Sequence, residues 1–244
     1  LPVDLAQRLT GRRVTAVARR AKFLLLRTDG DDVLLAHLGM SGRMKVIMPP
    51  LPSFARHEHV IFETEDGVQV RFEDPRRFGM MALTRADEVM NHPSLANLGP
   101  EPLAAEFDGP ALAARLAGRN GPVKMALMNQ TVVAGLGNIY VSEALFRAGI
   151  SPRRRAATIK GRRAERLAEA IRDVLHAAIA AGGSSLKDHR QPSGELGYFQ
   201  HAFAVYGRAG EACPGCDCLH RKTGGIRRIV QSGRSTFYCP THQR

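Results

Sequence analysis

All four cysteines of this 244-residue chain lie near its C-terminal end, in Cys213-Pro-Gly-Cys216-Asp-Cys218 and Cys239-Pro-Thr-His242. Zinc takes four nitrogen or sulfur ligands in a tetrahedron, and each C-x-x-C or C-x-x-H turn supplies two of them. Disulfides of a secreted protein are the alternative, but residues 1–212 contain no cysteine that would support such a framework. The spacing therefore predicts a structural zinc site in the last part of the chain.

The sequence predicts a zinc site more firmly than it identifies the four residues that bind the ion. Cys216 and Cys218 compete for one position, and His220 is a weaker rival. A set of three cysteines and one histidine is common in structural zinc sites. The predicted ligands are Cys213, Cys216, Cys239 and His242.

The stretch between the two ligand pairs predicts a hairpin. Residues 226–238 form two short runs of strand-forming residues around Ser232-Gly233. Such a hairpin, clamped by the metal, presents Arg234 next to its turn. A rigid basic finger of this kind indicates nucleic acid as the partner.

The charge of the chain favours a polyanionic partner. The formal net charge is +12 at pH 7, and a strongly basic chain of this kind is typical of nucleic-acid binders. Residues 147–172 hold nine Lys or Arg against two acidic residues. A helix face that is merely exposed to solvent is the alternative explanation for this cluster. No apolar run approaches the ~18–20 residues that span a membrane, so we expect an intracellular protein without a membrane partner.

The order of sequence patterns predicts an α+β protein. Short apolar or alternating runs begin at Val14, Phe23, Val33, His59 and Val68, which is typical of a sandwich or barrel. Helical periodicity follows over 110–118, 122–131, 138–149 and 158–181. We expect a β-sandwich at 1–100, a helical domain at 101–200 and a zinc finger at 201–244, with a long polar loop over 182–200.

Three short motifs are candidates for ligand contact. Gly135-Leu-Gly137-Asn138 precedes a helix, so Asn138 is the expected N-cap and the helix start a phosphate site. Asp74-Pro-Arg76-Arg-Phe78-Gly puts guanidinium groups and a ring on a tight turn, where a buried Phe is the alternative. His37-Leu-Gly-Met40-Ser-Gly places a Met between glycines, where a core Met is the alternative.

Taken together, these motifs resemble the formamidopyrimidine-DNA glycosylase family, bacterial base-excision enzymes for oxidised purines. The resemblance covers nearly the whole chain and rests on eight blocks in the family's order. They are Arg20-Ala-Lys22-Phe-Leu-Leu-Leu, His37-Leu-Gly-Met-Ser-Gly, Asp74-Pro-Arg-Arg-Phe-Gly, Leu98-Gly-Pro-Glu-Pro, Gly135-Leu-Gly-Asn-Ile-Tyr, Gly194-Glu-Leu-Gly-Tyr-Phe, Val205-Tyr-Gly-Arg and Gln231-Ser-Gly-Arg-Ser-Thr-Phe-Tyr-Cys.

The resemblance implies a β-sandwich, a helix–two-turn–helix domain and a zinc-finger hairpin, with DNA bound in the cleft between the domains. It implies that a base is flipped out of the duplex and that three side chains fill the gap. The gap-filling residues it implies are Met40, Arg76 and Phe78. Arg76 also matches a DNA-binding position of the family, as do His57 and Arg119, and Lys124 and Asn138 match further phosphate contacts. The elimination residues are Lys22 and Arg234, and residues 184–198 form the lesion loop.

The chain departs from the family pattern in three places. The family's nucleophile is an N-terminal proline followed by Glu, whose secondary amine attacks C1′ of the sugar. This chain begins Leu1-Pro2-Val3-Asp4, and the nitrogen of Pro2 is an amide. We therefore expect the segment with the proline to precede Leu1. The other departures are His242 in place of the usual fourth cysteine and His189 in place of a loop Phe.

These observations predict a DNA glycosylase and abasic-site lyase with one structural Zn²⁺. Its substrate is expected to be double-stranded DNA with 8-oxoguanine, formamidopyrimidine or abasic sites. We expect a monomer in the bacterial cytoplasm, at the nucleoid. The alternative from another class is a non-enzymatic binder of damaged DNA, and a general zinc-finger DNA-binding protein is a third and weaker reading.

Overall fold

The computed structural model describes residues 1–185, 192–217 and 224–244, which form two compact units. The first unit comprises residues 1–96 and 180–200, and the second comprises 97–179 and 201–244. The expected division into three domains stays a prediction. Residues 180–200 group with the strands, where the backbone N–H of Val46 donates to the carbonyl of Pro192 (3.3 Å). Residues 201–244 group with the helices because Phe146, Val205 and Phe237 share one core cluster.

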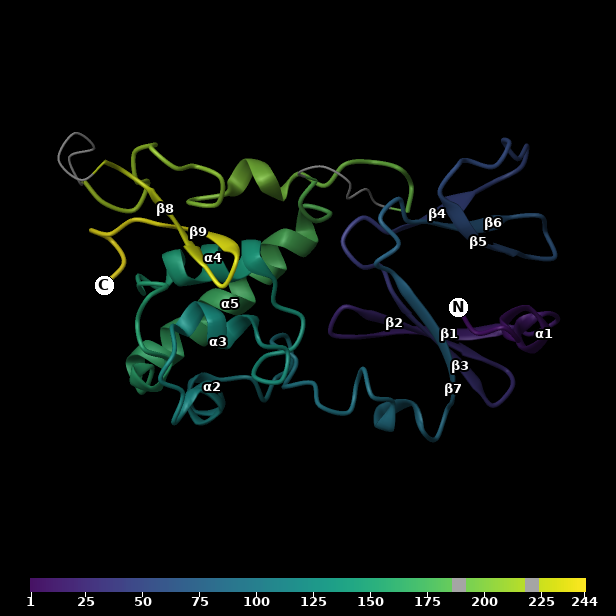
Figure 1. Cartoon of the computed structure of the whole chain (residues 1–244), viewed down its shortest axis with the longest axis horizontal. Coiled ribbons are helices and arrows are strands. Elements are labelled where there is room, and N and C mark those ends of the chain that lie inside the picture. The colour runs from purple at the N-terminus through teal and green to yellow at the C-terminus, as the bar shows by residue number, and fades with distance from the viewer. Residues whose placement is uncertain (186–191, 218–223) are drawn as a thin grey trace. The chain divides into compact units, whose positions relative to one another are not determined.

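The first unit is the expected β-sandwich, built from two antiparallel sheets (Figure 1). One sheet has the order β1-β2-β3-β7, at Val14–Arg20, Phe23–Thr28, Asp32–His37 and Met80–Arg85. The other has the order β4-β6-β5, at Arg43–Ile47, Gln69–Glu73 and Glu58–Glu63. Leu34 and Ala36 are two residues apart and so face the same side of β3. They pack with Phe72 of β6 and Met81 of β7, which joins the sheets.

The strands that begin near the five expected runs are present, but the sequence pattern does not predict β4 or β7. β4 carries Arg43 and Lys45 on alternate positions, and β7 opens with Met80-Met81-Ala82, which lacks β-branched residues. Both strands form because they complete sheets through register pairing with β6 and β3. A short helix, α1 (Leu5–Leu9), adds Leu5 to the core, and a 3₁₀ turn, η1, spans Val89–Asn91.

The second unit is helical and ends in the hairpin. Its helices are α2 (Gly109–Leu116), α3 (Val123–Met128), α4 (Asn138–Arg147) and α5 (Arg162–Ala180). A 3₁₀ turn, η2 (Ala156–Thr158), lies between α4 and α5, and another, η3 (Phe199–Ala202), spans the boundary between the units. The hairpin strands are β8 (Arg227–Gln231) and β9 (Arg234–Tyr238). Asp108 caps α2 by accepting a hydrogen bond from the N–H of Ala111 (2.8 Å). The buried stripe Leu167, Ile171, Val174 and Ala178 gives α5 its inward face.

Four expected helical segments thus correspond to α2 to α5, and the expected α+β class with a C-terminal hairpin is confirmed. Within the described residues, no helix is long and apolar enough to cross a membrane.

Candidate functional site

Lys22 lies at the tip of a tight hairpin in the first unit. The pairing of Arg20 with Phe23 leaves Ala21 and Lys22 as a two-residue turn between β1 and β2. Ala21 is buried with φ 52°, a left-handed conformation that costs a residue with a Cβ about 1–2 kcal/mol. Backbone strain of this kind persists where the surrounding structure fixes it, commonly at functional sites. The turn therefore holds the exposed Lys22 in a defined place.

Lys22 borders a pocket of ≈ 250 Å³ whose other walls come from the last residue of β3 and the loop after it. Those walls are His37, Leu38, Gly39, Met40, Ser41 and Gly42. Burial, and then the positive charge of Lys22, lower the pKa of His37. The Nδ1 of His37 accepts a hydrogen bond from the N–H of Gly39 (3.0 Å), which fixes the ring. At neutral pH the pocket therefore places the positively charged Lys22 beside an uncharged imidazole.

Met40 and Phe78 are exposed apolar side chains on neighbouring loops of the first unit. Their exposed fractions are 68% and 57%, so both buried alternatives that the sequence left open are excluded. The guanidinium carbon of Arg76 lies 4.9 Å from the centre of the Phe78 ring, a cation–π contact that orients both groups. Solvated apolar side chains beside an arginine suit insertion into a base stack.

A buried carboxylate, Asp74, ties these two loops together. It accepts hydrogen bonds from the Oγ of Ser41 and from the N–H of Gly79, both at 2.7 Å. The Oγ of Ser41 in turn accepts from the N–H of Arg76 (3.3 Å). Burial opposes ionisation of Asp74, but these hydrogen bonds outweigh it and lower its pKa. The charged carboxylate therefore fixes the loop of Met40 against the turn 74–79.

Glycine at position 39 permits the close approach of the two loops. Gly39 has φ 68°, and a Cβ there would lie 2.5 Å from the carbonyl carbon of Phe78. Such contacts do not occur for real Cβ atoms, so a side chain at this position would push the loops apart. The glycine of the motif is thus explained by backbone packing.

His57 is half-buried at the end of the loop between β4 and β5. Its carbonyl accepts a hydrogen bond from the N–H of Asp74 (3.0 Å), and its ring centre lies 6.4 Å from that of His59. The structure thus brings His57 next to the turn that carries Arg76. All of these groups belong to the first unit.

In the second unit, Lys124 of α3 is fully buried and reaches the finger hairpin. Its Nζ donates to the carbonyl of Ser235 (3.0 Å) and to the Oγ1 of Thr236 (2.6 Å). Burial, and then the charge of Arg234, lower the pKa of Lys124 to about 8. This amine therefore holds β9 in place, in addition to any role toward a phosphate.

Asn138 also contacts the finger. The sequence predicts Asn138 as the N-cap of α4, and this is wrong, because Gly137 is the cap and Asn138 is the first helical residue. Its amide is engaged elsewhere: the Nδ2 donates to the carbonyl of Ser235 (3.0 Å) and to the hydroxyl of Tyr206 (3.2 Å). The helix start is therefore joined directly to β9.

The predicted hairpin around Ser232-Gly233 is confirmed. Gln231 pairs with Arg234, and the two turn residues have φ 47° and 74°, the positive values of a type I′ turn. Arg234 is exposed beside this turn. Arg119 is also exposed, in the loop after α2, where its Nε donates to the carbonyl of Arg115 (2.9 Å). No contact of the described residues brings Arg119 to the finger.

Three cysteines come together beneath the hairpin. The Sγ atoms of Cys213, Cys216 and Cys239 lie within 4.8 Å of one another, and those of Cys216 and Cys239 are 3.7 Å apart. The cluster is packed against Phe146, Val205 and other apolar side chains. Three convergent thiols in an apolar setting can bind a metal ion. The rival ligands Cys218 and His220 lie outside the described residues.

His242 stands next to this cluster without joining it. Its Nε2 lies 3.1 Å from the carbonyl oxygen of Phe146, and its backbone N–H donates to the Sγ of Cys239 (3.4 Å). A metal-binding histidine typically donates its other ring N–H to a carbonyl, which fixes the tautomer. A proton on Nε2 would leave the lone pair on Nδ1. Three thiols and an imidazole are donors of the kind that tetrahedral metal sites use.

The predicted lesion loop 184–198 is described only in part. Residues 186–191, with His189, lie outside the described residues. At the base of the loop, the N–H of Gly197 donates to the Oγ of Ser185 (2.8 Å), and Ser184 pairs with Tyr198. A Cβ at position 197 would lie 2.4 Å from the carbonyl oxygen of Gly183. The two ends of the loop are therefore held side by side.

Some residues of the site are not identified by sequence reasoning. His37, Ser41 and Asp74 stand in recognised motifs, but their spacing does not reveal that they line the pocket or join the loops. Glu143 gives no sequence pattern at all: it is buried in α4 and accepts hydrogen bonds from the N–H groups of residues 204–206 at 2.8–3.1 Å. It fixes the chain that leads into the finger.

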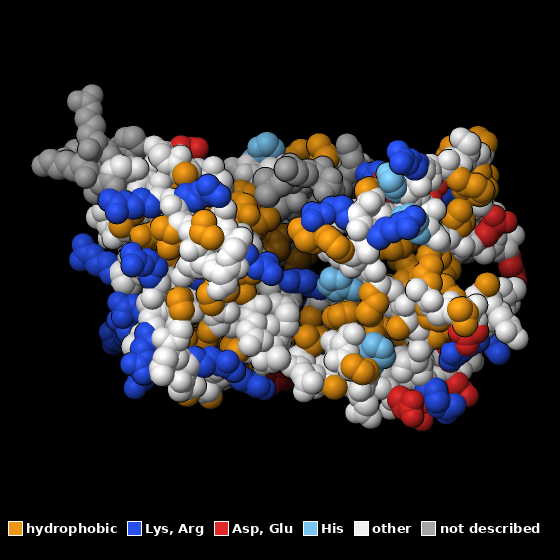
Figure 2. Space-filling view, in the orientation of Figure 1, with side chains coloured by type: hydrophobic (Ala, Val, Ile, Leu, Met, Phe, Trp, Pro, Cys, Tyr) orange, Lys and Arg blue, Asp and Glu red, His pale blue; other side chains and the backbone are white. Residues whose placement is uncertain are grey.

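Basic side chains cover much of the second unit. In Figure 2, Lys and Arg side chains spread over the surface of this unit on the visible face, with few acidic side chains among them. The sequence prediction of a basic chain with a polyanionic partner agrees with this distribution.

Comparisons with known proteins agree with this arrangement. Residues 1–81 match the family model of the formamidopyrimidine-DNA glycosylase N-terminal domain, and residues 98–190 match that of the formamidopyrimidine-DNA glycosylase H2TH domain. The chain is 61% identical over 247 residues to formamidopyrimidine-DNA glycosylase of Rhodospirillum rubrum, covering 100% of this chain and 87% of the relative.

Solved structures give the same result. The MutM (Fpg) protein of Thermus thermophilus is 42% identical, with a TM-score of 0.83 over 96% of this chain and 84% of that one. The Lactococcus lactis Fpg in complex with DNA containing an abasic site is 32% identical, with a TM-score of 0.88 over 99% of this chain and 86% of that one. With both halves matched in sequence and in fold, this chain belongs to the formamidopyrimidine-DNA glycosylase family.

Proposed function

We propose that this protein is a base-excision-repair enzyme that releases oxidised purines from double-stranded DNA and cleaves the abasic strand. The observation that carries the proposal is the pair of exposed apolar side chains, Met40 and Phe78, held by the buried Asp74 beside the pocket of Lys22. Exposed apolar side chains on these loops contribute little to the stability of the folded protein. When a base leaves the stack of the duplex, they can fill the gap and stabilise the complex with DNA.

Met40, Arg76 and Phe78 are assigned to the gap in the duplex. Extrusion of a base costs a few kcal/mol of stacking and pairing. Met40 and Phe78 can replace the lost stacking contacts, and the guanidinium of Arg76 can pair with the bases or phosphates that remain. The cation–π contact between Arg76 and Phe78 holds these two side chains together before DNA binds.

Lys22 is assigned to the elimination chemistry. An imine that joins an amine of the protein to C1′ of the sugar makes the C2′ proton acidic. Removal of this proton expels the 3′ phosphate, and a second elimination expels the 5′ phosphate. The exposed amine of Lys22 and the uncharged His37 beside it are suited to proton transfer at this sugar. Arg234, at the tip of the finger hairpin, is assigned to the leaving phosphate.

The remaining predicted contacts are assigned to phosphates. Asn138 at the start of α4 and Lys124 of α3 both donate to the carbonyl of Ser235 in β9, the residue after Arg234. The helix start adds N–H groups that favour an anion. His57 and the exposed Arg119 are assigned to the DNA backbone only because they match DNA-binding positions of the family.

Zinc is the metal we assign to the cysteine cluster, with Cys213, Cys216, Cys239 and His242 as ligands. Sulfur and imidazole donors in a tetrahedral set select zinc over magnesium or calcium. A bound ion would fix the finger that presents Arg234. We further propose that the protein acts as a monomer in the bacterial cytoplasm, at the nucleoid, where its substrate lies.

Binding of a duplex with an uncleavable abasic-site analogue tests the proposal. Affinity is expected to fall steeply between 50 and 200 mM salt, because Lys and Arg side chains release counterions from phosphates. Arg76→Ala is expected to cost about 1–3 kcal/mol of binding free energy. Lys22→Ala is expected to slow strand cleavage at a preformed abasic site more than it weakens binding. An affinity that hardly changes with salt would contradict DNA binding by this surface.

A further inference from the structure

The loop between β4 and β5, residues 48–57, has no apolar core of its own. Residues 48–56 are all exposed, including Leu51 and Phe54, whose exposed fractions are 40% and 66%. Exposed loops without buried apolar contacts are ordinarily the mobile parts of a protein. Nevertheless this loop ends at His57, which needs a fixed position to contact a phosphate. Another feature must therefore hold the loop.

That feature is the buried guanidinium of Arg71 in β6. Its Nη2 donates to the carbonyl of Pro52 (2.8 Å) and its Nη1 to the carbonyl of Ser53 (3.3 Å). The ring of Phe54 covers the guanidinium, with its centre 4.7 Å from the Cζ. One side chain thus contacts three consecutive residues of the loop. A planar fork of donors can do this, whereas the point charge of a lysine cannot.

Glu58, the first residue of β5, holds the other side of the loop. Its Oε2 accepts from the Nη1 of Arg71 (3.0 Å) and from the N–H of Ala55 (3.0 Å), and the side chains of Arg71 and Glu58 are each 1% exposed. The buried pair therefore grips the chain from residue 52 to residue 55. His57 follows two residues later, and its carbonyl is fixed by the N–H of Asp74.

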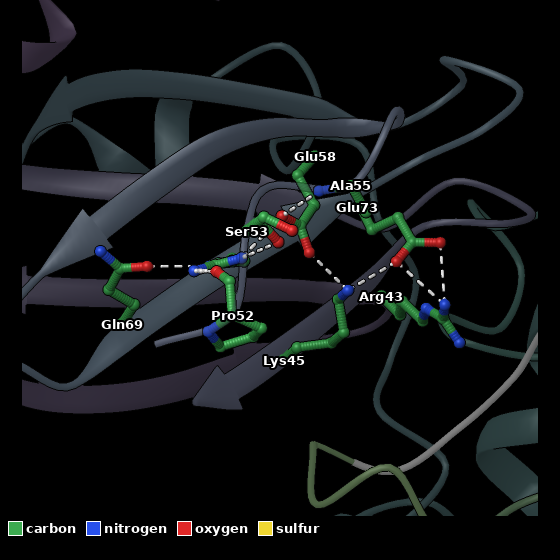
Figure 3. Close-up of polar contacts among 9 residues, drawn as sticks. Arg43, Lys45, Pro52, Ser53, Ala55, Glu58, Gln69 and Glu73 are labelled. Atoms are coloured by element: carbon green, nitrogen blue, oxygen red, sulfur yellow. Dashed lines mark hydrogen bonds and ion pairs between the residues drawn. The ribbon is translucent and has the colours of Figure 1, made fainter. Parts of the chain in front are cut away.

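The pair is itself oriented by a line of polar contacts across the sheet (Figure 3). The Nε of Arg71 donates to the Oε1 of Gln69 (2.8 Å). On the other side, Lys45 bridges Glu58 (2.5 Å) and Glu73 (2.8 Å), and Glu73 also pairs with Arg43 (2.8 Å). Burial of Glu58 raises its pKa, but Lys45, Ala55 and Arg71 outweigh this and the net pKa is lowered. The carboxylate is thus kept charged.

Stability alone does not account for this arrangement. A buried ion pair is often no more stabilising than apolar side chains of the same volume, because both charges lose their hydration. What apolar side chains cannot do is grip two successive carbonyls of an exposed loop. The arrangement is therefore better suited to fixing the position of the loop than to stabilising the sheet.

We infer that Arg71, oriented by Glu58, is a positioning residue that holds the loop 52–57 so that His57 meets the DNA backbone. The inference rests on the proposed function, since it needs His57 to contact DNA. Arg71 itself is too deeply buried to be a DNA contact, since its side chain is 1% exposed. Its effect passes through the loop alone.

Binding of an abasic-analogue duplex by four variants tests this inference. They are Arg71→Lys, His57→Ala, the double variant of both, and Arg43→Lys as the matched control, because Arg43 lies in the same line of contacts but does not touch the loop. Arg71→Lys is expected to weaken binding about 5- to 150-fold, as a lost contact of about 1–3 kcal/mol would. The double variant is expected to bind no more weakly than His57→Ala, and Arg43→Lys like the unchanged protein.

The NMR signals of the His57 ring supply a readout that a loss of stability would not move. They are expected to shift on DNA binding in the unchanged protein and in Arg43→Lys, but not in Arg71→Lys. If Arg71→Lys does not fold, Arg71→Leu with Glu58→Leu removes both buried charges together and carries the same expectations.

The outcomes separate the two proposals. Normal binding by His57→Ala would overturn the role of His57 in DNA binding and this inference with it. Weak binding by His57→Ala with normal binding by Arg71→Lys would overturn the positioning role alone. Additive losses in the double variant would also overturn it, because Arg71 would then act on DNA binding by another route.

Discussion

Lys124 and Asn138 share one acceptor: the carbonyl oxygen of Ser235 lies 3.0 Å from the Nζ of Lys124 and 3.0 Å from the Nδ2 of Asn138. The two side chains come from α3 and α4, on either side of the glycine-rich turn at 135–137. Ser235 directly follows Arg234. The two predicted phosphate contacts of the helices therefore also set the position of the finger arginine.

Stability around Lys124 is expected to depend on pH. Its pKa in the folded protein is lowered to about 8, while an unfolded lysine titrates near 10.4. Between these values the unfolded chain binds one more proton, so stability rises with pH across this window. Lys124→Met removes the effect. Urea unfolding at several pH values is expected to show the unchanged protein gaining stability relative to this variant from about pH 8 to 10.

The exposed Lys160 provides the control for this prediction. Lys160→Met lies outside the finger and its contacts, so its comparison with the unchanged protein reports the general effect of losing one lysine. A stability difference for Lys124→Met that does not change with pH would show that the Lys124 amine keeps an ordinary affinity for protons.

Asp74→Ala is expected to destabilise the first unit by about 1–3 kcal/mol. The substitution leaves the Oγ of Ser41 and the N–H of Gly79 without their buried acceptor, and unmade hydrogen bonds of buried groups carry a cost of this size. Abasic-duplex binding should weaken as well, because the loops of Met40 and Phe78 lose their link. Chemical unfolding and binding measure the two effects, with Glu65→Ala at an exposed position as control.

Met40→Ala and Phe78→Ala are expected to weaken lesion binding while leaving stability nearly unchanged. Both side chains are exposed in the free protein, so their truncation creates no cavity. The loss should be larger on an abasic-analogue duplex than on an undamaged one, since only the former offers a gap. Met90→Ala, at another exposed methionine (53%), is the matched control. Equal losses on both duplexes would place these residues outside the gap.

Metal analysis is expected to give about one zinc per chain, and Cys213→Ser or Cys239→Ser to lose it and weaken DNA binding. His242→Cys should retain zinc, because thiolate and imidazole are both good zinc ligands, whereas His242→Ala should bind it more weakly.

Cys216→Ser and Cys218→Ser, made separately, decide which of these two residues is the zinc ligand. Retention of zinc by both single variants but not by the double variant would show that they substitute for each other.

The sequence by itself determined the family, a strand-rich first part followed by four helices and a hairpin, and the residue types of the site, but it did not predict β4 or β7. Motifs such as Asp74-Pro-Arg76-Arg-Phe78-Gly fix local geometry, because proline, glycine and charged side chains restrict a tight turn in few ways. The hairpin around Ser232-Gly233 follows from spacing for the same reason. These features depend on residues that are close together in the chain. The spacing of the cysteines predicted a metal site but left Cys216 and Cys218 open, and the structure brings Cys239 to Cys213 and Cys216.

Only the tertiary structure decided which distant residues act on one another. Asp74 joins two loops, Lys124 reaches a strand more than a hundred residues later, and Arg71 grips the loop of His57. None of these contacts has a sequence pattern, because a buried polar side chain is defined by the partner that satisfies it, and that partner is set by packing. The expected N-cap at Asn138 fails on the same ground: its amide is drawn to Ser235 and Tyr206 once α4 packs against β9.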